Sequence, residues 1–241
     1  MKSLLLLVLL WPGALLAAGG EAHLDRAPID IRDAASIQRG AKVFVNYCLN
    51  CHSAQYMRYI RLTDLGLTEQ QIRDNLMFVG DKVGETMSIP MKKAEASEWF
   101  GVVPPDLSVI ARSRGPDWLY TYLRTYYRDS ETATGWNNLA FPNVGMPHVL
   151  WELQGQQVLK VEEHEGPHAK THTSTLVLEA PGTLSPREYD RLVADLVNYL
   201  VFMGEPMRAQ RAHIGYAVLI ALGVLFVLSY LLKKEYWKDV H

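Results

Sequence analysis

The chain has 241 residues, of which 24 are Lys or Arg, 26 are Asp or Glu, 49% are apolar and only two are cysteine. This length is sufficient for one domain with its own core and too great for a mini-protein held together by disulfides. A formal net charge of −2 argues against a strongly basic nucleic-acid-binding protein, so we expect no nucleic acid among its partners.

The first 18 residues have the layout of a secretory signal peptide. Lys2 supplies a positive charge, residues 4–10 form an unbroken apolar run, and small residues follow Pro12-Gly13. The apolar run is short for a bilayer core of ~30 Å, which favours cleavage over an uncleaved N-terminal anchor. We therefore predict residues 1–18 as a signal peptide, with the uncleaved anchor as the alternative.

Two amphipathic helices are predicted near the two ends of the region that follows. Residues 36–47 place apolar side chains at offsets of three and four, which gives one helical face leading directly into Cys48. Ser185 and Glu188 form a capping-box pattern around Pro186, and an apolar helical period continues from there to residue 204. Residues 68–78 and 116–127 are further helix candidates.

The stretch between these helices turns polar after residue 151. Short apolar runs at 158–161 and 175–178 predict a β-hairpin whose loop contains Gly166-Pro167. Three histidines fall at spacings of four in that loop: His164, His168 and His172. Such spacing could bind a metal only on a helix, which Gly-Pro disfavours, so we interpret them as solvated loop residues.

Residues 214–232 contain 19 residues without a charge. As a helix they would span about 28 Å, enough to cross the hydrocarbon layer of a membrane. Lys233, Lys234 and Trp237 follow as basic and aromatic anchors, which favours a transmembrane helix over a buried core helix.

Together these segments predict one exported domain with a C-terminal anchor. The predicted parts are the domain at 19–206, a linker at 207–213, the transmembrane helix at 214–232 and a cytoplasmic tail at 233–241. The tail is placed in the cytoplasm because the signal peptide would export everything before the anchor.

Cys48, Cys51 and His52 form the motif Cys-x-x-Cys-His. Two thiols one helical turn apart can form thioethers with the two vinyl groups of a haem, and the adjacent imidazole can bind the iron. A thioredoxin-like redox pair would need a strand before the cysteines, and a zinc site would need two more ligands at suitable spacing. We therefore predict one haem c, bound covalently through two thioethers.

A six-coordinate electron-transfer haem also needs a second axial ligand, and a thioether sulfur there raises the reduction potential. Met146 lies in a loop whose Gly145 and Pro147 restrict the backbone, which suits a ligand supplied from the opposite side. Met87 and His148 are the alternatives that the residues alone leave open. For the haem propionates, Arg112 and Arg114 are candidate partners, although arginines on a solvated helix face would look the same.

Taken together, these motifs resemble the cytochrome c1 family, the c-type haem subunit of the cytochrome bc1 complex (ubiquinol–cytochrome c reductase), in a bacterial form. The resemblance covers nearly the whole exported chain. The residues that carry it, besides Cys48-x-x-Cys51-His52-Ser53, are Arg39-Gly40, Tyr56, Tyr59, Arg61, Leu62, Pro104-Pro105-Asp106-Leu107-Ser108, Arg112, Arg114, Gly145-Met146-Pro147 and Glu205-Pro206.

The resemblance implies a mainly α haem domain of the c-type cytochrome kind, with irregular loops, a small β-hairpin and one C-terminal transmembrane helix. It implies His52 and Met146 as the axial ligands and Arg114 near a propionate. Pro104 and Pro105 are expected against the haem ring. At the position of Trp118 the family can carry a tyrosine that bonds a propionate, so we include Trp118 among the expected haem contacts.

The family also implies partners and a location. We expect cytochrome b and the Rieske iron–sulfur protein in one dimeric complex of the bacterial inner membrane, with the haem domain in the periplasm. The chain would be an electron-transfer subunit of the reductase, without a catalytic acid or base of its own, that passes electrons from the Rieske protein to a c-type cytochrome. The alternatives are a membrane-tethered carrier cytochrome that serves an oxidase and an exported thiol–disulfide protein.

Overall fold

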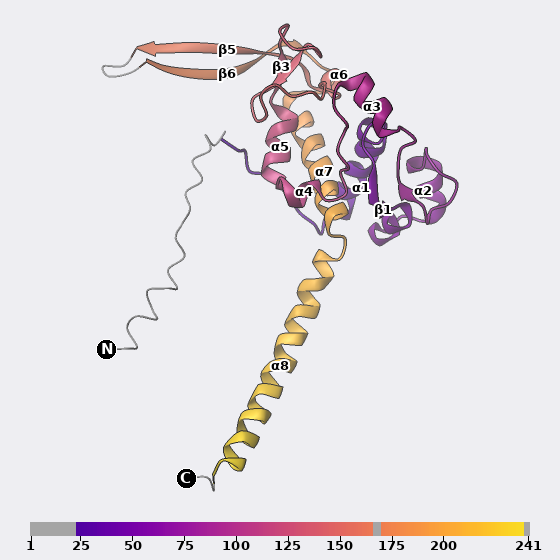
Figure 1. Cartoon of the computed structure of the whole chain (residues 1–241), viewed down its shortest axis with the longest axis vertical. Helices are drawn as coiled ribbons and strands as arrows, with labels where there is room; N and C mark the ends of the chain where they lie inside the picture. Colours follow the sequence, from indigo (N-terminus) through magenta and orange to yellow (C-terminus); the bar gives the residue numbers. More distant parts are fainter. Residues whose placement is uncertain (1–22, 166–169, 239–241) are drawn as a thin grey trace.

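The computed structural model describes residues 23–165 and 170–238, and Figure 1 shows a mainly helical body from which one long helix extends. The predicted signal peptide and the last residues of the tail lie outside the described residues. The helical segments are α1 (Ala34–Val43), η2 (a π-helical turn, Phe44–Cys48), η3 (a 3-10 helix, Tyr59–Leu65), α2 (Glu69–Leu76), α3 (Lys93–Phe100), α4 (Ile110–Ser113), α5 (Pro116–Arg124), α6 (Trp151–Gln154), α7 (Pro186–Gly204) and α8 (Arg208–Tyr236).

Three antiparallel strand pairs complete the described part of the fold. They are β1 (Ala54–Arg58) with β2 (Thr86–Met87), β3 (Tyr126–Arg128) with β4 (Trp136–Asn138), and β5 (Gly155–Glu165) with β6 (Lys170–Pro181). The helices, the small strand pairs and the irregular loops between them confirm the predicted fold class.

Helices α1 and α7, which are far apart in sequence, pack closely against each other. A Cβ atom added at Gly40 would lie 1.9 Å from the backbone oxygen of Asp195, so only glycine allows the two backbones to approach this closely. The Asp195 carboxylate also accepts hydrogen bonds from the Ser36 hydroxyl at 2.6 Å and from Arg39 Nε at 2.6 Å. This contact joins the helix before the Cys-x-x-Cys-His motif to the last helix of the domain.

Both predicted flanking helices begin with side-chain caps. The Asp33 carboxylate accepts a hydrogen bond from the Ser36 amide at 2.9 Å at the start of α1. At the start of α7 the Glu188 carboxylate accepts from the Ser185 amide at 2.9 Å, as the capping-box pattern predicted. Each cap satisfies an amide that the helix itself leaves unpaired.

The helix candidate at 116–127 is shorter than predicted. Helix α5 ends at Arg124, and Tyr126 pairs with Asn138 in the β3–β4 ladder. The Asn138 side-chain amide donates to the Tyr122 carbonyl at 2.7 Å, so it takes an acceptor that a continuing helix would have used. A pattern of apolar spacing contains no information about this partner from a later strand.

The predicted hairpin is present but longer than expected. Residues His164 and His172, placed by the prediction in a loop, belong to β5 and β6, where their backbones pair with Thr171 and Glu163. His168 lies outside the described residues, and so do the side chains of the other two. Figure 1 shows the hairpin extending from the end of the body opposite to α8.

Helix α8 carries the predicted membrane span. Its segment His213–Tyr236 has a mean hydropathy of 2.4 and is not buried in the protein, which fits a helix that crosses a membrane. The predicted linker at 207–213 is largely helical, because α8 already begins at Arg208. Between α7 and α8 only three residues intervene, and Arg211 pairs there with Glu205.

Candidate haem site

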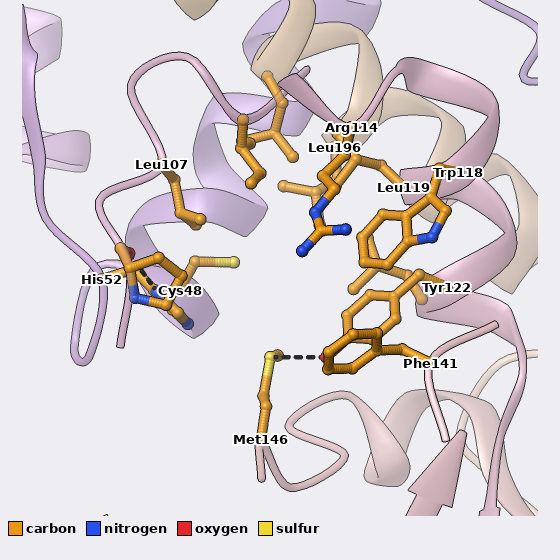
Figure 2. Close-up of a pocket in the computed structure, with 14 residues that line it drawn as sticks. Cys48, His52, Leu107, Arg114, Trp118, Leu119, Tyr122, Phe141, Met146 and Leu196 are labelled. Carbon is orange, nitrogen blue, oxygen red and sulfur yellow. Dashed lines mark hydrogen bonds between the residues drawn. The ribbon is translucent and has the colours of Figure 1, made fainter. Parts of the chain in front are cut away.

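An apolar cleft of about 270 Å³ lies between the Cys-x-x-Cys-His segment, α5 and α7. Figure 2 shows Cys48 and His52 on one side of it, Trp118 and Tyr122 on another, and Met146 reaching in from a separate loop. The residues that line it are Cys48, His52, Pro105, Leu107, Ile110, Arg114, Trp118, Leu119, Tyr122, Leu123, Phe141, Met146, Leu196 and Leu200.

The His52 ring is oriented by a backbone carbonyl. Its Nδ1 lies 2.8 Å from the Pro105 oxygen, and because a carbonyl can only accept, Nδ1 carries the proton. Burial lowers the pKa of His52, although the Pro105 carbonyl and the Asp106 carboxylate oppose the shift. The imidazole is therefore held neutral with a lone pair on Nε2, which is the form that binds a metal.

The Pro104–Ser108 segment is tied to the haem motif by specific hydrogen bonds. The Leu107 amide donates to the Ser53 carbonyl at 2.9 Å, and the Asp106 carboxylate accepts from the Gln55 amide at 2.8 Å. These bonds fix the position of the Pro105 carbonyl opposite His52. The structure thus gives a physical reason for the joint occurrence of the two motifs in the sequence.

The two cysteines are free thiols in different surroundings. Cys48 lines the cleft and is buried, and burial raises the pKa of its thiol to about 12, with a smaller contribution from Cys51. Thiol–disulfide oxidoreductases need the opposite shift, because the thiolate is their nucleophile. Cys51 is half-buried and lies with Pro104 in a neighbouring depression. Of the predicted haem contacts, Pro105 therefore lines the main cleft, whereas Cys51 and Pro104 do not.

Met146 is the one candidate for the second axial ligand that lines the cleft; the two alternatives do not. Met87 is fully buried, and its sulfur accepts a hydrogen bond from the Tyr199 hydroxyl at 3.3 Å. His148 is also buried, and its ring stacks on Tyr126 with centroids 4.8 Å apart. The geometry therefore favours Met146.

The Met146 sulfur accepts a hydrogen bond from the Tyr122 hydroxyl at 3.4 Å. Its loop is fixed by a left-handed residue, Asn143, with φ of 59°. Burial raises the pKa of Tyr122, so its hydroxyl stays protonated and remains a donor at neutral pH.

Arg114 directs its guanidinium group into the cleft, as Figure 2 shows. The guanidinium carbon lies 5.1 Å from the centre of the Trp118 ring, and Trp118 in turn stacks on Tyr122 at 4.7 Å. Trp118 thus lines the cleft and supports a cation there. Arg112 does not line the cleft; its side chain lies beside Gly204.

Motif reasoning did not identify the apolar walls of the cleft. They come from the segment after Pro105, from α4, α5 and α7, and from a loop, and the residues are Leu107, Ile110, Leu119, Leu123, Phe141, Leu196 and Leu200. The helical period does place the leucines of α5 and α7 on apolar faces, but it cannot tell a cofactor wall from ordinary core. Nothing in the sequence around Phe141 indicates its role.

The residues of the cleft fit a haem. They provide apolar walls for a porphyrin, a neutral imidazole, a thioether sulfur, the Cys48 thiol and one cation for an acidic substituent, and the second thiol, Cys51, borders the neighbouring depression. Among the residues whose side chains are described, no group of three His, Cys, Asp or Glu could hold a metal ion, so the zinc alternative has no support there. The fold and the cleft define a membrane-anchored c-type cytochrome.

Comparisons with known proteins give the particular family. The sequence profile described as "Cytochrome C1 family" matches residues 25–240. Cytochrome c1 of Allochromatium vinosum is 53% identical over 235 residues, covering 97% of this chain and 96% of that protein. A Nitrosomonas europaea protein named "Ammonia monooxygenase gamma subunit" is 54% identical over 240 residues, covering 100% of this chain and 98% of that one.

More distant members of the family are similar over most of their length as well. Cytochrome c1 of Rhodospirillum rubrum is 27% identical over 273 residues, covering 95% of both chains. The chain belongs to the cytochrome c1 family. It carries a c-type haem, is anchored in the membrane and transfers electrons as a subunit of the bc1 complex, with cytochrome b and the Rieske protein as partners.

Proposed function

We propose that this subunit holds a single haem c, linked through thioethers to Cys48 and Cys51, with His52 and Met146 as axial ligands. The observation that carries the proposal is that His52 and Met146 line one apolar cleft while Met87 and His148 do not. The bound haem supplies a one-electron couple. Pro105 orients the imidazole, the apolar walls exclude water, and Arg114 offers a cation to a propionate.

We further propose the route of the electron and the arrangement in the membrane. The subunit accepts an electron from the Rieske protein and passes it to a c-type cytochrome, within a dimeric complex. Residues 19–206 form the haem domain in the bacterial periplasm, residues 1–18 are the export signal, and 233–241 form the cytoplasmic tail. The apolar, unburied helix α8 and Lys233 and Lys234 at its end support this arrangement.

The name of the Nitrosomonas relative raises monooxygenation as a second function to consider. Oxygen activation at a haem requires an open axial position. The cleft offers a side chain for each axial position, His52 and Met146, which favours electron transfer over oxygen chemistry.

A haem stain on a denaturing gel tests covalent attachment. The full chain, expressed in a host that assembles c-type cytochromes, should stain, and the double variant Cys48→Ala/Cys51→Ala should not. Each single variant should keep one thioether and shift the α band of the pyridine haemochrome spectrum. An unstained wild-type chain in that host would overturn the proposal.

Matched methionine variants test the axial ligand. Met146→Leu should lose the near-infrared charge-transfer band of thioether-ligated ferric haem and lower the midpoint potential, because a thioether favours ferrous iron. Met87→Leu removes a thioether from the core and should change neither. The reverse pattern would show that Met87 is the ligand.

Purification with an oxidase and without cytochrome b would contradict the proposed route.

A further inference from the structure

Two tyrosines form a chain of hydrogen bonds that ends at the Met146 sulfur. The Tyr126 hydroxyl donates a hydrogen bond to the Tyr122 hydroxyl, which itself donates to Met146 Sδ at 3.4 Å. We propose that this hydrogen-bonded pair, the Tyr126–Tyr122 relay, raises the reduction potential of the haem. In it Tyr122 is a positioning residue that polarises the axial sulfur. The inference rests on the proposed axial role of Met146.

The chemistry follows from the two lone pairs of a thioether. One lone pair can bind iron while the other accepts a hydrogen bond. A donated hydrogen bond withdraws electron density from the sulfur, which weakens its donation to ferric iron and favours the reduced state. The bond from Tyr126 makes the Tyr122 hydroxyl a better donor, because hydrogen bonds in a chain polarise one another.

The surroundings hold both phenol rings in place. Tyr122 stacks on Trp118 with an interplanar angle of 11°, and Tyr126 is 1% exposed and stacks on His148. The backbone of Tyr122 is held as well, because the Asn138 amide donates to its carbonyl. The donor therefore needs no reorganisation to meet the sulfur, which is the condition for a hydrogen bond to act as a fixed electrostatic influence.

The same kind of bond occurs in the core, between two residues that do not line the cleft. The Tyr199 hydroxyl donates to the Met87 sulfur at 3.3 Å, and both residues are fully buried. Because Met87 and Tyr199 do not line the cleft, the pair offers a matched control. Tyr199→Phe removes a buried tyrosine–methionine hydrogen bond, and this loss should not affect the haem iron.

The test is a redox titration of the haem-loaded full chain, together with its near-infrared spectrum. Tyr122→Phe keeps the ring and its stacking, so the charge-transfer band should remain, at a changed energy, and the midpoint potential should fall. Loss of one hydrogen bond corresponds to a change of about twofold to tenfold in the ratio of reduced to oxidised haem at a fixed potential. Tyr199→Phe should leave this ratio unchanged.

A second variant separates the relay from a contact of Tyr122 alone. Tyr126→Phe should lower the potential by less than Tyr122→Phe does, and it should have no further effect when Tyr122 is already phenylalanine. Additive effects of the two substitutions would contradict a relay.

Other outcomes distinguish this inference from the proposed function. An unchanged potential in Tyr122→Phe, when Met146→Leu has lost its band, would overturn the relay and leave the ligand assignment intact. A band that survives in Met146→Leu would overturn both. An equal fall in Tyr199→Phe and Tyr122→Phe would mean that the potential responds to general loosening of the core, which also overturns the relay.

Discussion

Replacing Gly40 by alanine tests the contact between α1 and α7 because two effects of opposite sign compete. Alanine is favoured over glycine in a helix interior by about 1 kcal/mol, so local propensity alone predicts a more stable protein. The packing predicts the opposite, since the new Cβ would lie 1.9 Å from the Asp195 backbone oxygen and 2.8 Å from the Tyr199 Cβ.

The size of the effect can be worked out from these distances. Real Cβ atoms stay beyond about 3 Å from a neighbour, so α1 and α7 would have to separate by roughly 1 Å. Overpacking of this kind costs about 3 kcal/mol at the upper end of its usual range, which leaves a net loss of about 2 kcal/mol after the gain in helix propensity. A domain of this size would lose about 4–8 °C in Tm.

The assay is thermal unfolding of the full chain in detergent, followed by far-ultraviolet circular dichroism. Gly84→Ala is the control, because nothing lies within 4 Å of the position that its Cβ would occupy, and it should change Tm little. A Tm of Gly40→Ala equal to or above that of the wild type would refute the close helix contact. Haem incorporation should fall together with Tm, since α1 leads into Cys48 and α7 carries Leu196 and Leu200.

Three further predictions follow from individual contacts. Arg114→Gln should lower the midpoint potential of the haem, because a cation in the cleft favours the reduced state. Arg114→Lys keeps the charge and should have a potential close to that of the wild type. Equal potentials in the wild type and both variants would exclude an electrostatic role for Arg114. Tyr122→Phe should cost about 1–3 kcal/mol in urea denaturation by leaving the buried Tyr126 hydroxyl without its acceptor, and Tyr122→Phe/Tyr126→Phe should recover part of the loss. Hydrogen bonds from Ser185 hold the pKa of Glu188 below its ordinary 4.5. The ionised Glu188 therefore stabilises the fold fully above pH 4.5, and this stabilisation is lost as the pH falls through the lower folded-state pKa. The Tm of Glu188→Gln should accordingly fall less on acidification than that of the wild type.

The sequence was sufficient where a signal is local. The capping residues Ser185 and Glu188 act within one helical turn, and Cys48 and His52 belong to one turn of backbone, so the start of α7 and the placement of Cys48 and His52 together could be predicted. The long uncharged run of α8 is local in the same sense.

What could not be predicted depends on contacts between distant segments. The end of α5 is set by Asn138, and residue type alone left Met87 open as an alternative to Met146, although only Met146 lines the cleft. Met146 and Met87 are chemically identical side chains, so residue type cannot separate them. The bond from Tyr122 to Met146 likewise joins a helix to a loop 24 residues away, with no sequence pattern to indicate it.

The short junction between α7 and α8 has a consequence for encounters with other proteins. Leu196 and Leu200 of the cleft wall are on the same helix that ends three residues before the anchor, and the Arg211–Glu205 pair braces the junction. Because three residues can span only about 10 Å, the end of α7 stays close to the helix that crosses the membrane. A redox partner held at the same membrane searches an area instead of a volume, so the anchor shortens its search for the cleft without adding a contact.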